Sequence, residues 1–214
     1  MKISASFLSS KYKAKDLINK INNSKSDYLH VDIMDGKFVE NKTFTYSEIA
    51  KLTQNTNKTL DIHLMVRDPL KYIEKFALLN AEFITFHYES VKEKDIENII
   101  DIIHNFGIKA GISIKPNTNV SVIFPYLVKL DLVLIMSVEP GKSGQKFMES
   151  VVYKLDALNT EIKEKNYKTL ISIDGGINSE TIEFVRDKVD IVTSASYLHE
   201  GDIEESIDIL KGIK

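Results

Sequence analysis

The chain has 214 residues, of which 43% are hydrophobic and 28% are charged, and its net charge of −3 and lack of a basic run argue against nucleic acid as a partner. Because it contains no cysteine, disulfides are excluded and a bound metal ion would need nitrogen and oxygen ligands. No stretch approaches the roughly 18 apolar residues of a membrane span, and the first residues lack the apolar run of a signal peptide, so we expect a cytoplasmic enzyme.

Short segments rich in Ile, Val, Leu and Phe alternate with amphipathic stretches along the whole chain. The hydrophobic runs predict eight strands, at 3–7, 28–33, 59–64, 83–87, 109–114, 132–136, 169–173 and 190–193. Helical periodicity predicts helices at 71–79, 95–106, 147–163 and 203–210. Ser179 and Asp202 are residues of the type that begins a helix.

Repeated strand–helix units imply right-handed crossovers and a parallel sheet. Eight units in this length favour a single (β/α)8 TIM barrel that spans residues 1–214 as one domain. A doubly wound open sheet is the alternative. Its Gly-x-Gly-x-x-Gly loop after the first strand is missing, since the first glycine of the chain is Gly36.

Polar side chains stand where the apolar strands end, which is the face that carries the chemistry of such barrels. His30 and Asp32 are two residues apart and therefore point to one side of their strand, and His63 is on the next strand. Asp174 ends the seventh strand, which a closed barrel brings back across the mouth. Two imidazoles and two carboxylates suit Zn²⁺, Fe²⁺, Mn²⁺ or Co²⁺. The alternative is that each is a hydrogen-bonded core histidine or a helix-capping aspartate.

The other histidines and the methionines rank lower. His87 is at a strand end and could support a ligand, whereas we expect His104 on a helix surface and His199 in a loop. Three methionines follow strand cores and either pack there or exclude water around a ligand: Met34, Met65 and Met136.

Phosphate in such barrels binds in the loops after strands seven and eight. Gly175-Gly176 precedes a short helix expected near Ser179, whose free amides can hold an anion. Further donor-rich positions are Gly141, Ser143, Gly144 and Gln145 after strand six, and Ser194, Ala195 and Ser196 after strand eight. The alternative is that the glycines only make tight turns.

Together these segments resemble the ribulose-phosphate 3-epimerase family along nearly the whole chain. The motifs that carry the resemblance are Ser4-Ala5-Ser6-Phe7-Leu8, Leu29-His30-Val31-Asp32-Ile33-Met34-Asp35-Gly36, Asp61-Ile62-His63-Leu64-Met65-Val66, Met136-Ser137-Val138-Glu139-Pro140-Gly141 and Ile173-Asp174-Gly175-Gly176-Ile177. The second and third are specific to this family and its close sugar-epimerase relatives.

The resemblance implies a barrel with one divalent metal ion and no organic cofactor. It assigns the metal to His30, Asp32, His63 and Asp174, with Asp32 and Asp174 also the acid/base pair. It places Ser6 near the substrate and the three methionines around it. The expected reaction inverts C3 of a ketopentose phosphate through an enediolate that the metal stabilises. The family also implies a homo-oligomer.

The chain departs from the family at its phosphate loops. Lys142 and Ser143 replace an aromatic residue and a glycine, and Ser194-Ala195 stands where Gly-Ser is usual. Glu40 replaces a proline. These changes spare the predicted metal and acid/base residues but touch the phosphate site, so they bear on the choice of sugar phosphate.

Ribulose 5-phosphate 3-epimerase, which forms xylulose 5-phosphate, is the leading hypothesis. The alternatives are an allulose 6-phosphate 3-epimerase and a non-catalytic sugar-phosphate-binding relative. A related decarboxylating barrel is disfavoured because its Asp-x-Lys-x-x-Asp motif is missing, with Met34 at the lysine position.

Overall fold

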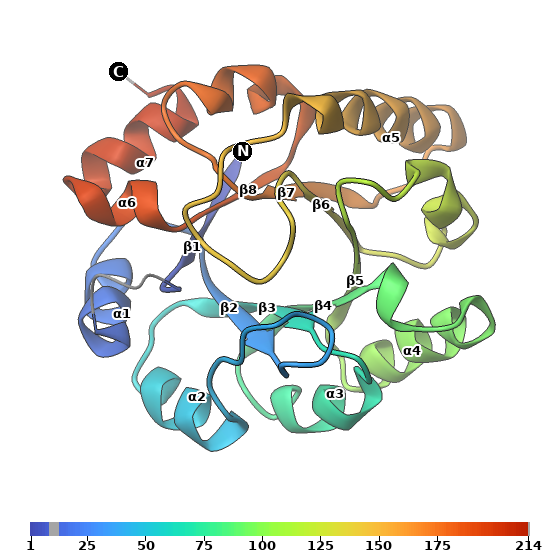
Figure 1. Cartoon of the computed structure of the whole chain (residues 1–214), viewed down its shortest axis with the longest axis horizontal. Helices are drawn as coiled ribbons and strands as arrows, with labels where there is room; N and C mark the ends of the chain where they lie inside the picture. The colour runs from blue at the N-terminus through green and yellow to red at the C-terminus, as the bar shows by residue number, and fades with distance from the viewer. Residues whose placement is uncertain (9–12, 214) are drawn as a thin grey trace.

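Eight parallel strands form a closed ring in the computed structural model, which describes residues 1–8 and 13–213 (Figure 1). The strands are β1 (Lys2–Ser6), β2 (Tyr28–Met34), β3 (Thr59–Met65), β4 (Ala81–His87), β5 (Lys109–Ile114), β6 (Leu132–Met136), β7 (Leu170–Asp174) and β8 (Ile191–Ser194). Each pairs with the next, and β8 pairs with β1, Ser194 lying opposite Ala5. The predicted (β/α)8 barrel is confirmed, and each strand ends within two residues of its predicted bounds.

Helices surround the ring, and most crossovers contain one (Figure 1). The α-helices are α1 (Ala14–Asn22), α2 (Tyr46–Thr53), α3 (Leu70–Phe76), α4 (Glu93–Asn105), α5 (Val152–Lys165), α6 (Ser196–Glu200) and α7 (Ile203–Lys211). Short 3₁₀ turns are η1 (Tyr88–Ser90), η2 (Val120–Tyr126), η3 (Glu149–Val151), η4 (Thr181–Phe184) and η5 (Arg186–Lys188). Asp202 begins α7 as predicted, its carboxylate accepting from the amides of Glu204 and Glu205. Among the described residues, no helix has the length and hydropathy to cross a membrane.

One local prediction was wrong and another was confirmed only in part. The helix expected near Ser179 is the 3₁₀ turn η4, and the Asn178 side chain accepts from the amides of Glu180 and Thr181 at its start. His199 is not in a loop but in α6, where it is buried and its Nε2 lies 2.8 Å from the Ser6 carbonyl oxygen. Both depend on contacts between segments that are distant or irregular, which periodicity does not report. His104 lies half-exposed in α4, as predicted.

The strands separate two apolar regions by the alternation of their side chains. On β2, Leu29, Val31 and Ile33 join the main core between the sheet and the helices. A second cluster consists of residues at the beginnings of the even-numbered strands: Tyr28, Phe83, Leu132 and Ile191. Such a layer of four side chains from alternate strands fills the interior of a barrel of this type. The interior is therefore filled by apolar side chains at the beginnings of the strands.

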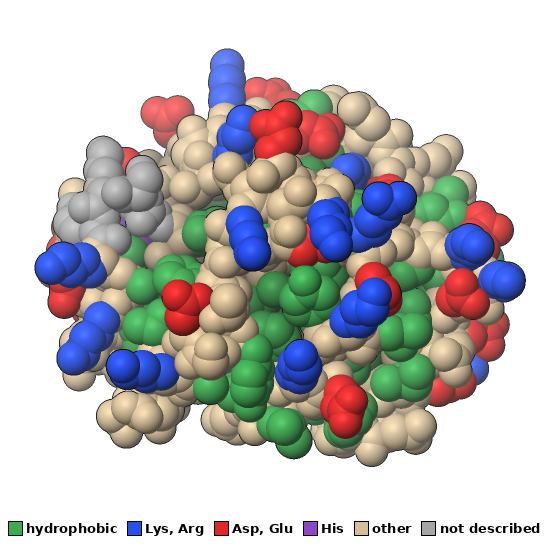
Figure 2. Space-filling view, turned by 60° about the horizontal axis from the view of Figure 1, so that its bottom comes forward, with side chains coloured by type: hydrophobic (Ala, Val, Ile, Leu, Met, Phe, Trp, Pro, Cys, Tyr) green, Lys and Arg blue, Asp and Glu red, His purple; other side chains and the backbone are tan. Residues whose placement is uncertain are grey.

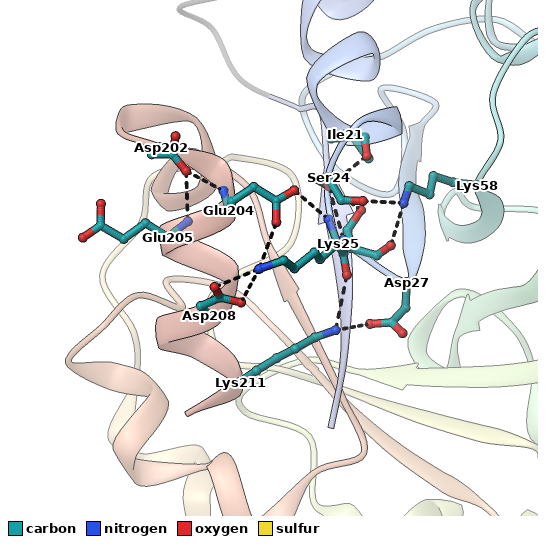
Figure 3. Close-up of polar contacts among 11 residues, drawn as sticks. Ile21, Ser24, Lys25, Asp27, Lys58, Asp202, Glu204, Glu205, Asp208 and Lys211 are labelled. Atoms are coloured by element: carbon teal, nitrogen blue, oxygen red, sulfur yellow. Dashed lines mark hydrogen bonds and ion pairs between the residues drawn. The ribbon is translucent and has the colours of Figure 1, made fainter. Parts of the chain in front are cut away.

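Ion pairs tie the last helix to the turn before β2 (Figure 3). The Lys25 ammonium lies 2.9 Å from a carboxylate oxygen of Asp208 and 3.6 Å from one of Glu204. Lys211 at the end of α7 pairs with Asp27 at 3.0 Å. These contacts hold α7 against the segment between α1 and β2. On the face shown in Figure 2, basic and acidic side chains are interspersed rather than gathered by sign.

Candidate functional site

Four side chains from three strands converge at the mouth of the barrel. His30, Asp32, His63 and Asp174 each offer one ligand atom, and these atoms all lie within 4.8 Å of one another. On β2 the alternation puts His30 and Asp32 on the same side, and the register sets Asp32 opposite His63 on β3. Asp174 ends β7, which ring closure brings near β2 through β8 and β1. The structure thus brings all four predicted metal ligands together.

Asp32 is the centre of this cluster. Its Oδ1 lies 3.2 Å from Nε2 of His30 and 3.2 Å from Nδ1 of His63, and both imidazoles are buried. Its Oδ2 accepts a hydrogen bond of 3.1 Å from the hydroxyl of Ser6. Ser6, predicted to lie near the substrate, therefore orients the Asp32 carboxylate.

Asp61 is a site residue that the sequence prediction missed. Its Oδ2 lies 2.8 Å from Nδ1 of His30 and accepts a 2.7 Å bond from the hydroxyl of Ser4. Asp61 is buried on β3, two residues before His63, so both face the barrel interior. A carboxylate that accepts from Nδ1 of an imidazole turns the other nitrogen towards a metal, as is common in metal sites. The sequence signal that could have revealed Asp61 was its spacing of two residues from His63, which places both side chains on the same side of β3.

Burial and charge pull the pKa values of the two central aspartates apart. Burial alone would raise the pKa of Asp32, but the His30 and His63 imidazoles hold it below its usual range. Burial and the neighbouring Asp32 carboxylate raise the pKa of Asp174 to about 6. Although burial opposes a charge on His30, Asp32 and Asp61 raise the pKa of its imidazole well above its usual value. Two carboxylates with such divergent pKa values can act as a proton acceptor and a proton donor.

The donor set fits a divalent metal ion. In its neutral form, His30 donates from Nδ1 to Asp61, and its Nε2 offers a lone pair that a cation would take in place of the proton shared with Asp32. His63 Nδ1 faces the same oxygen. A cation at this point would replace the protons between these atoms, and imidazole nitrogens with carboxylate oxygens are the ligands that Zn²⁺, Fe²⁺, Mn²⁺ and Co²⁺ take. The residues present therefore suit the group that the sequence predicted.

A cavity of about 500 Å³ opens beside this cluster. Asp32 and Asp174 line it, together with the residues predicted to bind substrate: Ser6, Met34, Met65, Met136, Gly141, Ser143, Gly144, Gln145, Gly175, Gly176, Ser194 and Ala195. The segment after β6 extends over the centre of the ring in Figure 1 and forms one wall. Tyr197 and Glu200 of α6 also line the cavity and were not predicted.

Several predicted phosphate donors are engaged within the protein. The Gln145 amide donates to the carbonyl oxygens of Glu139 and Lys142, and the Ser194 hydroxyl donates to that of Ile177. Lys142 is exposed, with its Nζ 3.8 Å from a carboxylate oxygen of Glu40. Backbone amides of these loops are further candidate donors for an anion, beside lining side chains such as those of Ser143 and Ser196.

Gly176 allows the loop after β6 to approach closely. A Cβ atom built on Gly176 would lie 2.6 Å from the amide nitrogen of Phe147 and 2.8 Å from the carbonyl oxygen of Gln145. Its φ of +63° also favours glycine. The Gly-Gly pair therefore serves packing between the two loops, beyond making a turn.

A (β/α)8 barrel with a His/Asp cluster beside a methionine-lined cavity has the architecture of a barrel enzyme with a candidate metal site. The chain matches the model of the ribulose-phosphate 3 epimerase family over residues 2–199 and belongs to that family, whose curated members are isomerases acting on carbohydrates.

Two relatives illustrate the match. A ribulose-phosphate 3-epimerase from Helicobacter pylori (strain J99) is 37% identical over 100% of this chain and 98% of its own length. One from Chlamydia pneumoniae is 36% identical over 90% of this chain and 86% of its own. A solved structure, Mycobacterium tuberculosis tryptophan synthase, superposes with a TM-score of 0.66 over 99% of this chain and 89% of that chain, at 8% identity, which is a likeness of fold alone.

Proposed function

We propose that the chain interconverts D-ribulose 5-phosphate and D-xylulose 5-phosphate by inverting C3, with one divalent metal ion held by His30, Asp32, His63 and Asp174. One observation carries this proposal: Asp32 from β2 and the half-buried Asp174 from β7 meet in one His/Asp cluster beside a cavity large enough for a sugar phosphate. The activity in the names of the relatives supports the choice of substrate.

The chemistry needs a base and an acid on opposite faces of one carbon, because C3 lies next to a ketone and its C–H bond is weakly acidic. Asp32, held ionised by the imidazoles, accepts the proton from C3 in one direction, and Asp174, with a pKa raised to about 6, returns a proton to the other face. In the reverse direction the two carboxylates exchange roles. A bound divalent cation supplies Lewis-acid stabilisation of the negative charge that develops on the substrate oxygens.

The surrounding residues support this transfer. The Ser6 hydroxyl fixes the orientation of Asp32 through its 3.1 Å bond. Met34, Met65 and Met136 line the cavity with apolar surface, which limits water at the reacting carbon. Backbone amides of the loops after β6 and β7 bind the phosphate.

The alternatives concern the far end of the substrate. The altered loop residues Lys142 and Ser143 line the cavity. Because they differ from the residues usual in the family, a hexulose phosphate such as allulose 6-phosphate is the second candidate substrate. A non-catalytic sugar-phosphate-binding relative is the third. We also propose that the chain forms a homo-oligomer and acts in the cytoplasm as one domain.

A two-substrate assay decides between these alternatives. We expect the purified protein with added metal to show a higher kcat/KM on ribulose 5-phosphate than on allulose 6-phosphate. A clear preference for the hexulose phosphate would favour the second candidate, and binding of either phosphate without turnover would favour the third. Metal analysis of protein purified without chelator identifies the ion.

Asp174→Asn tests the two-aspartate scheme. The variant keeps the size of the side chain, but an amide cannot accept or donate the proton that the carboxyl group exchanges. We therefore expect kcat to fall by about 10²–10⁴-fold. Asp187→Asn, which makes the same change at an exposed position in η5, is the control. Turnover by Asp174→Asn near that of the control contradicts the scheme.

A further inference from the structure

His63 is in contact with a second buried imidazole on the side away from Asp32. Nε2 of His63 and Nε2 of His87 are 2.9 Å apart, and their ring centroids are 4.9 Å apart. His87 is the last residue of β4, the strand next to β3, and both side chains are fully buried. Two ring nitrogens at this distance share one hydrogen, so one imidazole must donate and the other accept.

The neighbouring carboxylate decides which one donates. Nδ1 of His87 lies 3.2 Å from Oε2 of Glu89, whose pKa is lowered to about 2 by hydrogen bonds from His87 and Thr118 that outweigh its burial. An ionised carboxylate only accepts, so the hydrogen of neutral His87 is on Nδ1 and its Nε2 is bare. Neutral His63 must then donate from Nε2, and its Nδ1 offers a lone pair to a cation that would lie between it and the Asp32 oxygen 3.2 Å away.

Glu89 is itself held in place by the loop after β5. Its Oε1 accepts from the amide of Lys115 at 2.7 Å and from the hydroxyl of Thr118. The buried ammonium of Lys154 on α5 donates to the carbonyl oxygens of Lys115 and Thr118, at 2.9 and 2.7 Å. The orientation of Glu89 is therefore fixed by the loop after β5, which the Lys154 side chain connects to α5.

The two histidines of the cluster are thus oriented by different means. His30 contacts the carboxylate of Asp61 directly, whereas a neutral imidazole stands between His63 and its carboxylate. Asp32, Asp61 and Asp174 already place three carboxyl groups in this buried region. An intervening imidazole sets the tautomer of His63 without bringing a further negative charge against them.

We propose that His87 and Glu89 are positioning residues that fix the Nε2–H tautomer of His63 and so prepare its Nδ1 as a metal ligand. The inference rests on the metal site of the proposed function and adds two residues, on β4 and in η1, that do not contact the metal or the substrate. It also links the loop after β5 to the metal centre through an unbroken series of hydrogen bonds.

Glu89→Gln tests this series without removing bulk. The two donors from Lys115 and Thr118 attract the single oxygen of the glutamine, which turns its NH₂ group towards Nδ1 of His87. His87 then carries its hydrogen on Nε2, His63 must accept at Nε2, and the hydrogen of His63 moves to Nδ1, where it opposes a metal ion. We expect Zn²⁺ affinity, measured by competition with a chelating dye, to fall about 10–100-fold.

Glu82→Gln is the matched control, because it makes the same change on the same strand, where Glu82 pairs with Lys109 at the opposite end. Its Zn²⁺ affinity should equal that of the wild type. Thermal unfolding of the metal-free variants verifies that both are folded. Equal Zn²⁺ affinity in Glu89→Gln and Glu82→Gln overturns the inference.

A second measurement needs no variant. Imidazole ¹⁵N NMR of the Zn²⁺-loaded wild type distinguishes the tautomers, and we expect His87 to carry its hydrogen on Nδ1 and His63 on Nε2. The opposite tautomer of His87 overturns the inference even if Glu89→Gln does not fold. If the wild type binds no Zn²⁺, both this inference and the proposed metal site are contradicted. Zn²⁺ binding without epimerase activity contradicts only the proposed reaction.

Discussion

Gly176→Ala perturbs the contact between the loops after β6 and β7. The added Cβ would lie 2.6 Å from the Phe147 amide nitrogen, so that segment must retreat by about 0.8 Å to reach ordinary contact. The φ of +63° adds about 1–2 kcal/mol of backbone strain for alanine. A displacement of this size in a substrate-positioning loop can cost up to about 10²-fold. We therefore expect KM for the sugar phosphate to rise about 10–100-fold.

Gly107→Ala provides the control for the strain alone. Gly107 has a φ of +73° but lies beyond the end of α4, and an added Cβ there meets nothing within 4 Å. Steady-state kinetics and inhibition by inorganic phosphate measure the effect, with urea unfolding to compare stabilities. Gly176→Ala should raise both KM and the phosphate inhibition constant, and Gly107→Ala neither. If both variants have the KM of the wild type, the loop contact does not position the phosphate.

Three further predictions follow from buried groups. Asp61→Asn should weaken Zn²⁺ binding about 10–100-fold, because the neutral amide holds the His30 imidazole less firmly than the carboxylate does; unchanged affinity in a dye competition would rule out this role. Gly111→Ala should lower the free energy of unfolding by about 1–3 kcal/mol, because its Cβ would lie 2.3 Å from Oγ1 of Thr85. In a double-mutant cycle measured by urea unfolding, adding Thr85→Ala to Gly111→Ala should recover part of the lost free energy. If the effects of the two substitutions on the free energy of unfolding are additive, the contact is not the cause. Burial lowers the pKa of His199 below its ordinary value of 6.5. As the pH falls, His199 of the unfolded chain is therefore protonated at a higher pH than His199 of the folded chain. The free energy of unfolding should thus decrease as the pH drops below 6.5. His199→Gln should flatten this part of the pH profile, and an unchanged slope would show that another group is responsible.

The strand and helix pattern was readable because it depends on local periodicity. The hydrophobic runs located all eight strands, and the polar residues that interrupt the ends of β2, β3 and β7 marked the candidate site. Asp61 lies in one of these runs and was overlooked, since its contact with His30 depends on the register of β2 with β3. His87 was expected at a strand end where it could support a ligand, but its contacts with His63 and Glu89 depend on the folded structure, including the register of β3 with β4.

Irregular segments escaped sequence analysis for a related reason. The burial of His199 follows from the contact of α6 with the backbone of Ser6, which is at the other end of the chain. The internal hydrogen bonds of Gln145 are likewise a property of the folded loop, because an amide side chain serves equally well as a ligand donor.

The sequence by itself determined the class of fold, the family and the four residues His30, Asp32, His63 and Asp174. The periodicity of a strand and the type of each residue can be read from a short segment without knowledge of its contacts. Only the tertiary structure decided which atoms of those residues converge. Closure of the ring brings β7 near β2, and the interior packing sets Asp61 against one imidazole and His87 against the other. A hydrogen bond between strands depends on register and burial, and neither is a property of any single segment.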